Sequence, residues 1–192
     1  MLTKLPLALL LVLLALAVLS DLRTRRIPNP LVFGGALLGI LLNAALPSGA
    51  GLFIEPFGAI GLLSALAGLA LGLALLLPMY MLRAMGAGDV KLMAMLGAFV
   101  GPGAIVGIVV LTLLAGGVLA LLVALFSGRL LPLLRNSYHL MLHSMLRSMH
   151  GETGQLEAPA APSGKLPYAV AIAAGALPYL LVGALTGSNL FS

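Results

Sequence analysis

The chain has 192 residues, 61% of them hydrophobic and only 8% charged, and its mean hydropathy of +1.19 is far outside the range of a soluble domain. The formal net charge of +5 would suggest a nucleic-acid partner for a soluble protein. Here, however, Lys and Arg cluster in short gaps between apolar runs, a pattern that reports membrane orientation. We therefore expect membrane lipid, and no nucleic acid, around the chain. The absence of cysteine excludes a disulfide framework, a thiolate nucleophile and a cysteine-based zinc site.

The first apolar run, residues 5–20, could pass for a secretory signal peptide. It follows Lys4 and contains the Ala15-Leu16-Ala17 pattern that resembles a cleavage site. An arginine cluster follows at once, and more apolar runs follow that cluster. We therefore expect this run to be kept as the first transmembrane helix.

Breaks between the apolar runs predict six transmembrane helices. Each run is near the roughly 20 residues that a helix needs to cross about 30 Å of hydrocarbon. The predicted spans are residues 5–20, 31–46, 57–82, 84–100, 104–126 and 166–187. The predicted fold is therefore an all-α, polytopic membrane protein, with residues 1–192 as a single domain.

The basic residues predict the orientation of these spans. In a six-span arrangement Lys4 alone falls on one side, and all the others fall on the opposite side, which is predicted to be the cytoplasm. The N-terminus and the loop at residues 47–56 are then expected outside. The basic residues on the cytoplasmic side are Arg23, Arg25, Arg26, Arg83, Lys91, Arg129, Arg135, Arg147 and Lys165.

The longest polar segment, residues 127–165, is predicted to have two parts on the cytoplasmic side. Residues 138–150 have the pattern of an amphipathic helix that lies at the membrane interface. Residues 151–164, rich in Gly, Pro and Ala, read as a flexible link. His139 and His143 have a spacing compatible with a metal, but no carboxylate or cysteine nearby completes a site, so we expect none.

The chain contains only two aspartates, Asp21 and Asp89. Asp21 closes the first predicted span, Asp89 lies in the fourth, and both are expected toward the cytoplasmic face. Carboxylates at membrane depth usually mark a functional site. Two of them in a poorly solvated site cannot both ionise easily, so the pair is expected to share a proton, as in aspartic proteases.

The residues around each aspartate could have either a catalytic or a purely structural role. Gly86 and Gly88 remove side-chain bulk, so a substrate backbone could approach Asp89 closely. Asp89 could instead pair with Lys91 or Arg83 as a helix-terminal carboxylate. After Asp21, the prolines in the segment up to Pro30 predict a rigid turn, which could orient that carboxylate.

These motifs resemble those of the type IV prepilin peptidase family of GxGD intramembrane aspartyl proteases. The resemblance rests on GAGD at residues 86–89 with Val90 and Lys91 after it, and on Asp21 with Ile27-Pro28-Asn29 six residues later. The short form of the chain, with no N-terminal extension, resembles the subgroup that serves tight-adherence (Flp) pili, and so does Leu166-Pro167-Tyr168-Ala169 at the start of the last span. Longer members carry a cysteine-containing N-methyltransferase region in the connection between the first two spans.

The resemblance implies that Asp21 and Asp89 are the catalytic pair, supported by Gly86, Gly88, Lys91 and Ile27-Pro28-Asn29. It implies an aspartic endopeptidase of the bacterial cytoplasmic membrane that removes the short basic leader of a prepilin at the cytoplasmic face, without methylation and without a cofactor. The main alternative is a proton-coupled transporter, which also uses intramembrane acids. Both aspartates lie toward one face and no inverted repeat is visible, which favours the peptidase.

Overall fold

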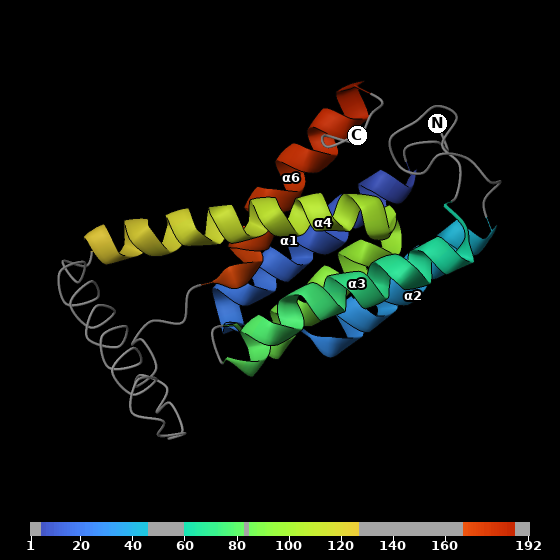
Figure 1. Cartoon of the computed structure of the whole chain (residues 1–192). Helices are drawn as coiled ribbons and strands as arrows, with labels where there is room; N and C mark the ends of the chain where they lie inside the picture. Colours follow the sequence, from blue (N-terminus) through green and yellow to red (C-terminus); the bar gives the residue numbers. More distant parts are fainter. Residues whose placement is uncertain (1–4, 46–59, 83–84, 127–166, 187–192) are drawn as a thin grey trace, which may run out of the picture. The chain divides into compact units, whose positions relative to one another are not determined.

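The computed structural model describes residues 5–45, 60–82, 85–126 and 167–186 (Figure 1), and within these ranges every regular element is a helix. The prediction of an all-α fold is therefore confirmed for this part of the chain. The interfacial helix predicted at residues 138–150 and the link after it lie outside the described residues. The helices are α1 (Leu5–Thr24), α2 (Asn29–Ala45), α3 (Leu62–Met81), α4 (Ala87–Phe126) and α6 (Tyr168–Thr186).

Length and composition make the described helices suited to a membrane. In α1, α3 and α4, the segments Pro6–Thr24, Leu62–Met81 and Ala87–Val123 are long and apolar enough to cross a bilayer. The other two helices, α2 and α6, are apolar but shorter. The chain is thus a helical membrane protein, and the count of six spans remains a prediction.

The first helix runs further than its apolar residues suggested, from Leu5 to Thr24 rather than to Ser20. A helix end needs no apolar side chains, because its last turn is held by hydrogen bonds. The N–H of Arg25 donates to the carbonyl oxygen of Asp21 at 2.9 Å, and Arg25 has a φ of 55° that turns the chain out of the helix. The hydroxyl of Ser20 then donates to the carbonyl oxygen of Arg26 at 2.9 Å. Asp21 is therefore fixed in the last turn of α1.

The helix α4 covers both the fourth and the fifth predicted spans, with a break at Gly101. Gly101 has a φ of 79° and a ψ of 178°, and Pro102, which follows it, has no N–H to donate. The break leaves carbonyl oxygens without helical partners, and the side-chain amide of Asn43 on α2 donates to those of Ala98 and Phe99 at 2.9 and 3.3 Å. The predicted break at Gly101 is thus present, and the element labelled α4 consists of two helical segments, one before and one after Gly101.

Glycines allow the backbones of α3 and α4 to touch. A Cβ atom built on Gly68 would collide with the carbonyl oxygen of Gly97, and one built on Gly97 would collide with that of Gly68. One turn along, a Cβ on Gly72 would lie 2.7 Å from the carbonyl oxygen of Met93. Small residues drive such contacts because the hydrophobic effect provides little attraction between helices in lipid. As a result, residues 92–100 are all buried, and they hold the start of α4 in place.

The chain divides into two units, of which the first comprises residues 1–116 and 167–192 and contains both aspartates. Of the second unit, residues 117–166, the structure describes the last part of α4, up to Phe126. The prediction of a single domain over residues 1–192 stays a prediction.

Candidate active site

Asp21 lies in the last turn of α1 and is nearly buried, with 8% of its surface exposed. Its Oδ2 accepts a hydrogen bond of 3.2 Å from the backbone N–H of Ala169 in the first turn of α6. The first N–H groups of a helix have no carbonyl partner within that helix. The carboxylate of Asp21 therefore caps α6 from a different helix.

Asp89 lies in the first turn of α4 and is equally buried, with 8% of its surface exposed. Its Oδ2 accepts a hydrogen bond of 3.1 Å from the backbone N–H of Gly86, the residue immediately before the helix. A side chain that reaches back to the N–H of the capping residue is half of a capping box, and an acidic group in the first turn also suits the helix dipole. Asp89 therefore caps its own helix.

The two carboxylates are close enough for their negative charges to repel each other. Asp21 and Asp89 are 68 positions apart in the sequence, and they lie at the end of α1 and the start of α4. Each carboxylate has one oxygen bound by a backbone N–H of a helix N-terminus. Two neighbouring carboxyl groups are the kind of groups that general acid–base catalysis of hydrolysis requires.

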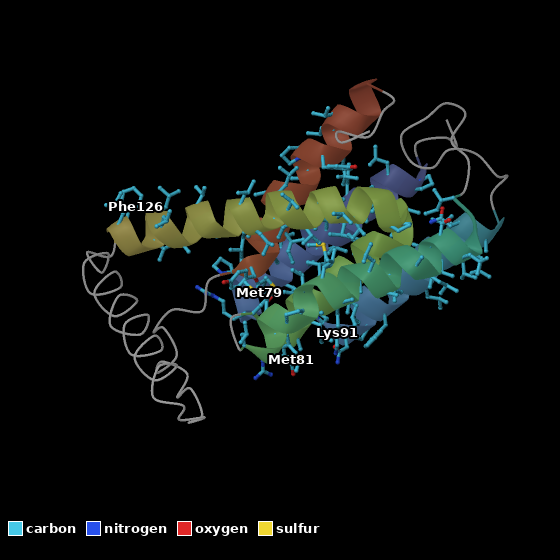
Figure 2. All side chains as sticks on the ribbon, in the orientation of Figure 1. Met79, Met81, Lys91 and Phe126 are labelled. Carbon is cyan, nitrogen blue, oxygen red and sulfur yellow. The ribbon has the colours of Figure 1, made fainter. Side chains whose placement is uncertain are left out.

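The segment between α1 and α2 packs against the start of α4. A Cβ atom built on Gly88 would lie 3.2 Å from the Cβ of Ile27. The amine of Lys91 donates a hydrogen bond of 3.0 Å to Oδ1 of Asn29. Lys91, labelled in Figure 2, also lies with its amine 5.1 Å from the centre of the Phe33 ring. The structure therefore brings together the two motifs that the sequence singled out.

Pro28 and Lys91, two other residues singled out from the sequence, make local contacts near the start of α2 and α4. The carbonyl oxygen of Pro28 accepts from the N–H groups of Leu31 and Val32 at 3.2 and 3.4 Å, which starts α2. Among the described residues, Lys91 donates to Asn29, whereas Arg83, the other alternative partner of Asp89, lies outside them.

The two glycines of the GAGD motif have different surroundings. Ile27 occupies the space beside Gly88, so the missing side chain there makes room for the turn after α1. Gly86 is exposed, and a Cβ atom on it would lie 3.1 Å from Oδ2 of Asp89. The lack of a side chain at Gly86 therefore leaves the space beside Oδ2 of Asp89 open. That a substrate approaches Asp89 through this space stays a prediction.

Sequence reasoning missed three hydrogen-bonding groups, two beside Asp21 and one beside the Gly101 kink. Ala169 lies in the Leu166-Pro167-Tyr168-Ala169 motif, but it contacts Asp21 through its backbone N–H, and a motif does not identify the partner of a backbone group. Ser20 and Asn43 are different, because each is a polar side chain in an apolar helix, and such residues often bind backbone groups in membrane proteins. Their positions next to Asp21 and opposite the Gly101 kink could have been examined on that ground.

The helices and the buried acids define a helical membrane protein with a pair of interacting carboxylates at the ends of two helices. A model of the type IV leader peptidase family matches residues 8–121, which include both aspartates and more than half of the chain. The chain belongs to this family, and it is therefore a peptidase. No curated protein and no solved structure matches it.

Proposed function

We propose that this protein is an aspartic endopeptidase that uses Asp21 and Asp89 as its catalytic pair. The observation that carries the proposal is that two buried carboxylates, one at the end of α1 and one at the start of α4, lie close enough to interact electrostatically. Burying two acids close together costs stability, and acids within membrane-spanning segments usually mark a functional site. Acid–base hydrolysis of a peptide bond is the function that agrees with membership of a peptidase family.

In the proposed reaction, one carboxylate is ionised and the other is protonated. The ionised carboxylate takes a proton from a water molecule, and the oxygen of that water attacks the carbonyl carbon of the peptide bond. The protonated carboxyl group donates its proton to the carbonyl oxygen. The carboxyl group that took the proton from water then gives it to the leaving nitrogen as the C–N bond breaks, and the other carboxylate takes a proton from a hydroxyl group of the tetrahedral intermediate, which restores the starting state. The products are a new carboxyl terminus and a new amino terminus.

The proposed substrate is a type IV prepilin of the Flp type, with a short basic leader that ends in glycine before a hydrophobic helix. The proposal rests on family membership and on the resemblance of this short chain, with its Leu166-Pro167-Tyr168-Ala169 motif, to members of the Flp subgroup. We infer that the cut falls on the cytoplasmic side of a bacterial cytoplasmic membrane, because both aspartates lie near the arginine cluster of residues 23–26.

We also infer that the enzyme does not methylate the new pilin N-terminus. The connection from the end of α1 at Thr24 to the start of α2 at Asn29 is only a turn. That turn is too short to form a binding site for a methyl donor.

The test is to incubate the purified protein in lipid nanodiscs with a synthetic prepilin and to measure the product masses. The proposal expects a leader peptide that ends in glycine and a mature pilin without added methyl groups. A mature product heavier by one methyl group would show that the inference about methylation is wrong, and it would leave the proposed peptidase activity intact. An uncut prepilin, together with proton flux into proteoliposomes, would favour the transporter.

A further inference from the structure

We propose that the first turn of α6 is a positioning element of the active site, because the N–H of Ala169 holds the carboxylate of Asp21 in its working orientation. This inference rests on the proposed function. It concerns a residue outside residues 8–121, the part that the family model matches. The role of Ala169 is inferred from its hydrogen bond to Asp21.

The contact joins two buried groups that lie 148 residues apart in the chain. Ala169 is fully buried and Asp21 is 8% exposed, so water has little access to replace the hydrogen bond of 3.2 Å between them. The N–H of Ala169 is one of the first in α6 and has no carbonyl partner within that helix. Loss of this bond would therefore leave both a carboxylate oxygen and a helix N–H without their partner.

The donor is held in place by the packing of α6 against the second part of α4. A Cβ atom built on Gly175 would collide with the backbone N of Thr112 and would lie 2.7 Å from its Oγ1. The two backbones are thus in direct contact, two turns along α6 from Ala169. Because this crossing restricts any sliding of α6, the N–H of Ala169 is presented to Asp21 from a rigid element.

The hydrogen bond engages one oxygen of Asp21 and restricts the rotation of its side chain. The Gly86 N–H engages Oδ2 of Asp89 in the same way. Each acid is thus held by the N-terminal end of a helix, and the relative orientation of the two acids depends on both contacts. Acid–base steps are sensitive to such positioning, so loss of the Ala169 N–H is expected to lower kcat rather than to raise KM.

The sharpest test deletes this N–H without changing the side chain. Lactic acid, the hydroxy-acid analogue of alanine, is placed at position 169 by nonsense suppression during cell-free synthesis into nanodiscs, which replaces the N–H with an oxygen atom. The matched control is the same replacement at Ala176, which is also fully buried but lies in the interior of α6. Both chains lose one backbone donor, but only the first loses the bond to Asp21.

We expect the change at Ala169 to lower kcat for prepilin cleavage about tenfold or more, the equivalent of a hydrogen bond to a charged group. KM should be unchanged, and the control at Ala176 should retain kcat within about threefold. Equal kcat values for the two modified chains would overturn the inference. If the unmodified chain cuts no prepilin, the proposed function itself fails, and the two failures are therefore distinguishable.

Proline offers a second way to remove the same donor if the ester at position 169 prevents insertion. The first turn of a helix tolerates proline, so Ala169→Pro and Val170→Pro both keep α6. The N–H of Val170 donates to the carbonyl oxygen of Pro167 at 3.0 Å, not to Asp21. Ala169→Pro should lower kcat at least about fivefold more than Val170→Pro at similar KM, and equal losses would contradict the proposal.

Discussion

The amine of Lys91 donates a hydrogen bond of 3.0 Å to Oδ1 of Asn29, a residue 62 positions earlier in the chain. Lys91 lies two residues after Asp89 on α4, and Asn29 is the first residue of α2. The bond therefore joins the turn that follows Asp21 to the helix that carries Asp89. Figure 2 shows Lys91 at the end of the helices where Met79 and Met81, in the last turn of α3, also lie.

This bond predicts that Lys91 and Asn29 act as a pair. Lys91→Met and Asn29→Ala should each lower kcat about three- to tenfold, because the bond is partly exposed and contributes only ~1 kcal/mol. The double variant should be no worse than either single one, since both remove the same contact. Arg23→Met, which removes another exposed basic side chain at this end, is the control. Fully additive losses in kcat would contradict the pairing.

The contact between Gly88 and Ile27 predicts how a side chain at position 88 would act. Gly88→Val should lower both kcat and the melting temperature, because its methyl groups would meet Ile27 and displace the turn that follows Asp21, at ~1–3 kcal/mol. Ile27→Ala in the same chain should restore part of both. Gly34→Val is the matched control, since a Cβ atom there would meet nothing within 4 Å. If Gly88→Val lowers kcat with the melting temperature unchanged, the substitution acts on substrate approach instead.

The amide of Asn43 predicts a loss of stability at the kink of α4. Asn43→Leu removes the donor to the carbonyl oxygens of Ala98 and Phe99 and should lower the free energy of unfolding in bicelles by ~1–3 kcal/mol. Leu41→Ala, at an exposed position on the same helix, should have a smaller effect. If the free energy of unfolding of Asn43→Leu equals or exceeds that of the parent, the two carbonyl groups do not need this donor.

The one-sided distribution of basic residues predicts which end of α2 faces the cytoplasm. Arg26→Cys precedes α2 and Ala45→Cys ends it, and both positions are exposed in this cysteine-free chain. A membrane-impermeant maleimide applied to intact cells should label Ala45→Cys alone, and Arg26→Cys should react only in inverted vesicles. Labelling of both from the outside would be incompatible with the predicted orientation.

The parts of the fold that could be predicted from the sequence are those that depend on local composition. Apolar runs predicted the helical membrane protein, and Gly101-Pro102 predicted the break in α4 from their backbone chemistry. Helix ends were less accurate, because the last turn of α1 continues through polar residues that are held by the Ser20 hydroxyl and the turn at Arg25. Nothing in the local composition reports such contacts.

The two aspartates were found because acids are rare in apolar helices, but their hydrogen-bond partners could not be found. Gly86 and Ala169 contribute backbone N–H groups, which every residue except proline has. The role of Gly88 was likewise hidden, since a glycine does not tell which neighbour occupies the space beside it. Contacts over long sequence separations, such as that between Ile27 and Gly88, require the fold.

Asp21 and Asp89 are proposed to act as one catalytic unit, and conservative substitution of each aspartate is the sharpest test of that pairing. Asparagine keeps a side-chain oxygen for the N–H groups of Ala169 and Gly86, so Asp21→Asn and Asp89→Asn should preserve the fold, whereas the alanine variants should also lose ~1 kcal/mol of stability. The measurement is the rate of prepilin cleavage by the purified Asn variants in nanodiscs. Each should be slower by at least roughly 10³-fold, and the double variant should be no slower. Cleavage by either folded single variant at a rate near that of the parent would show that Asp21 and Asp89 are not the catalytic pair.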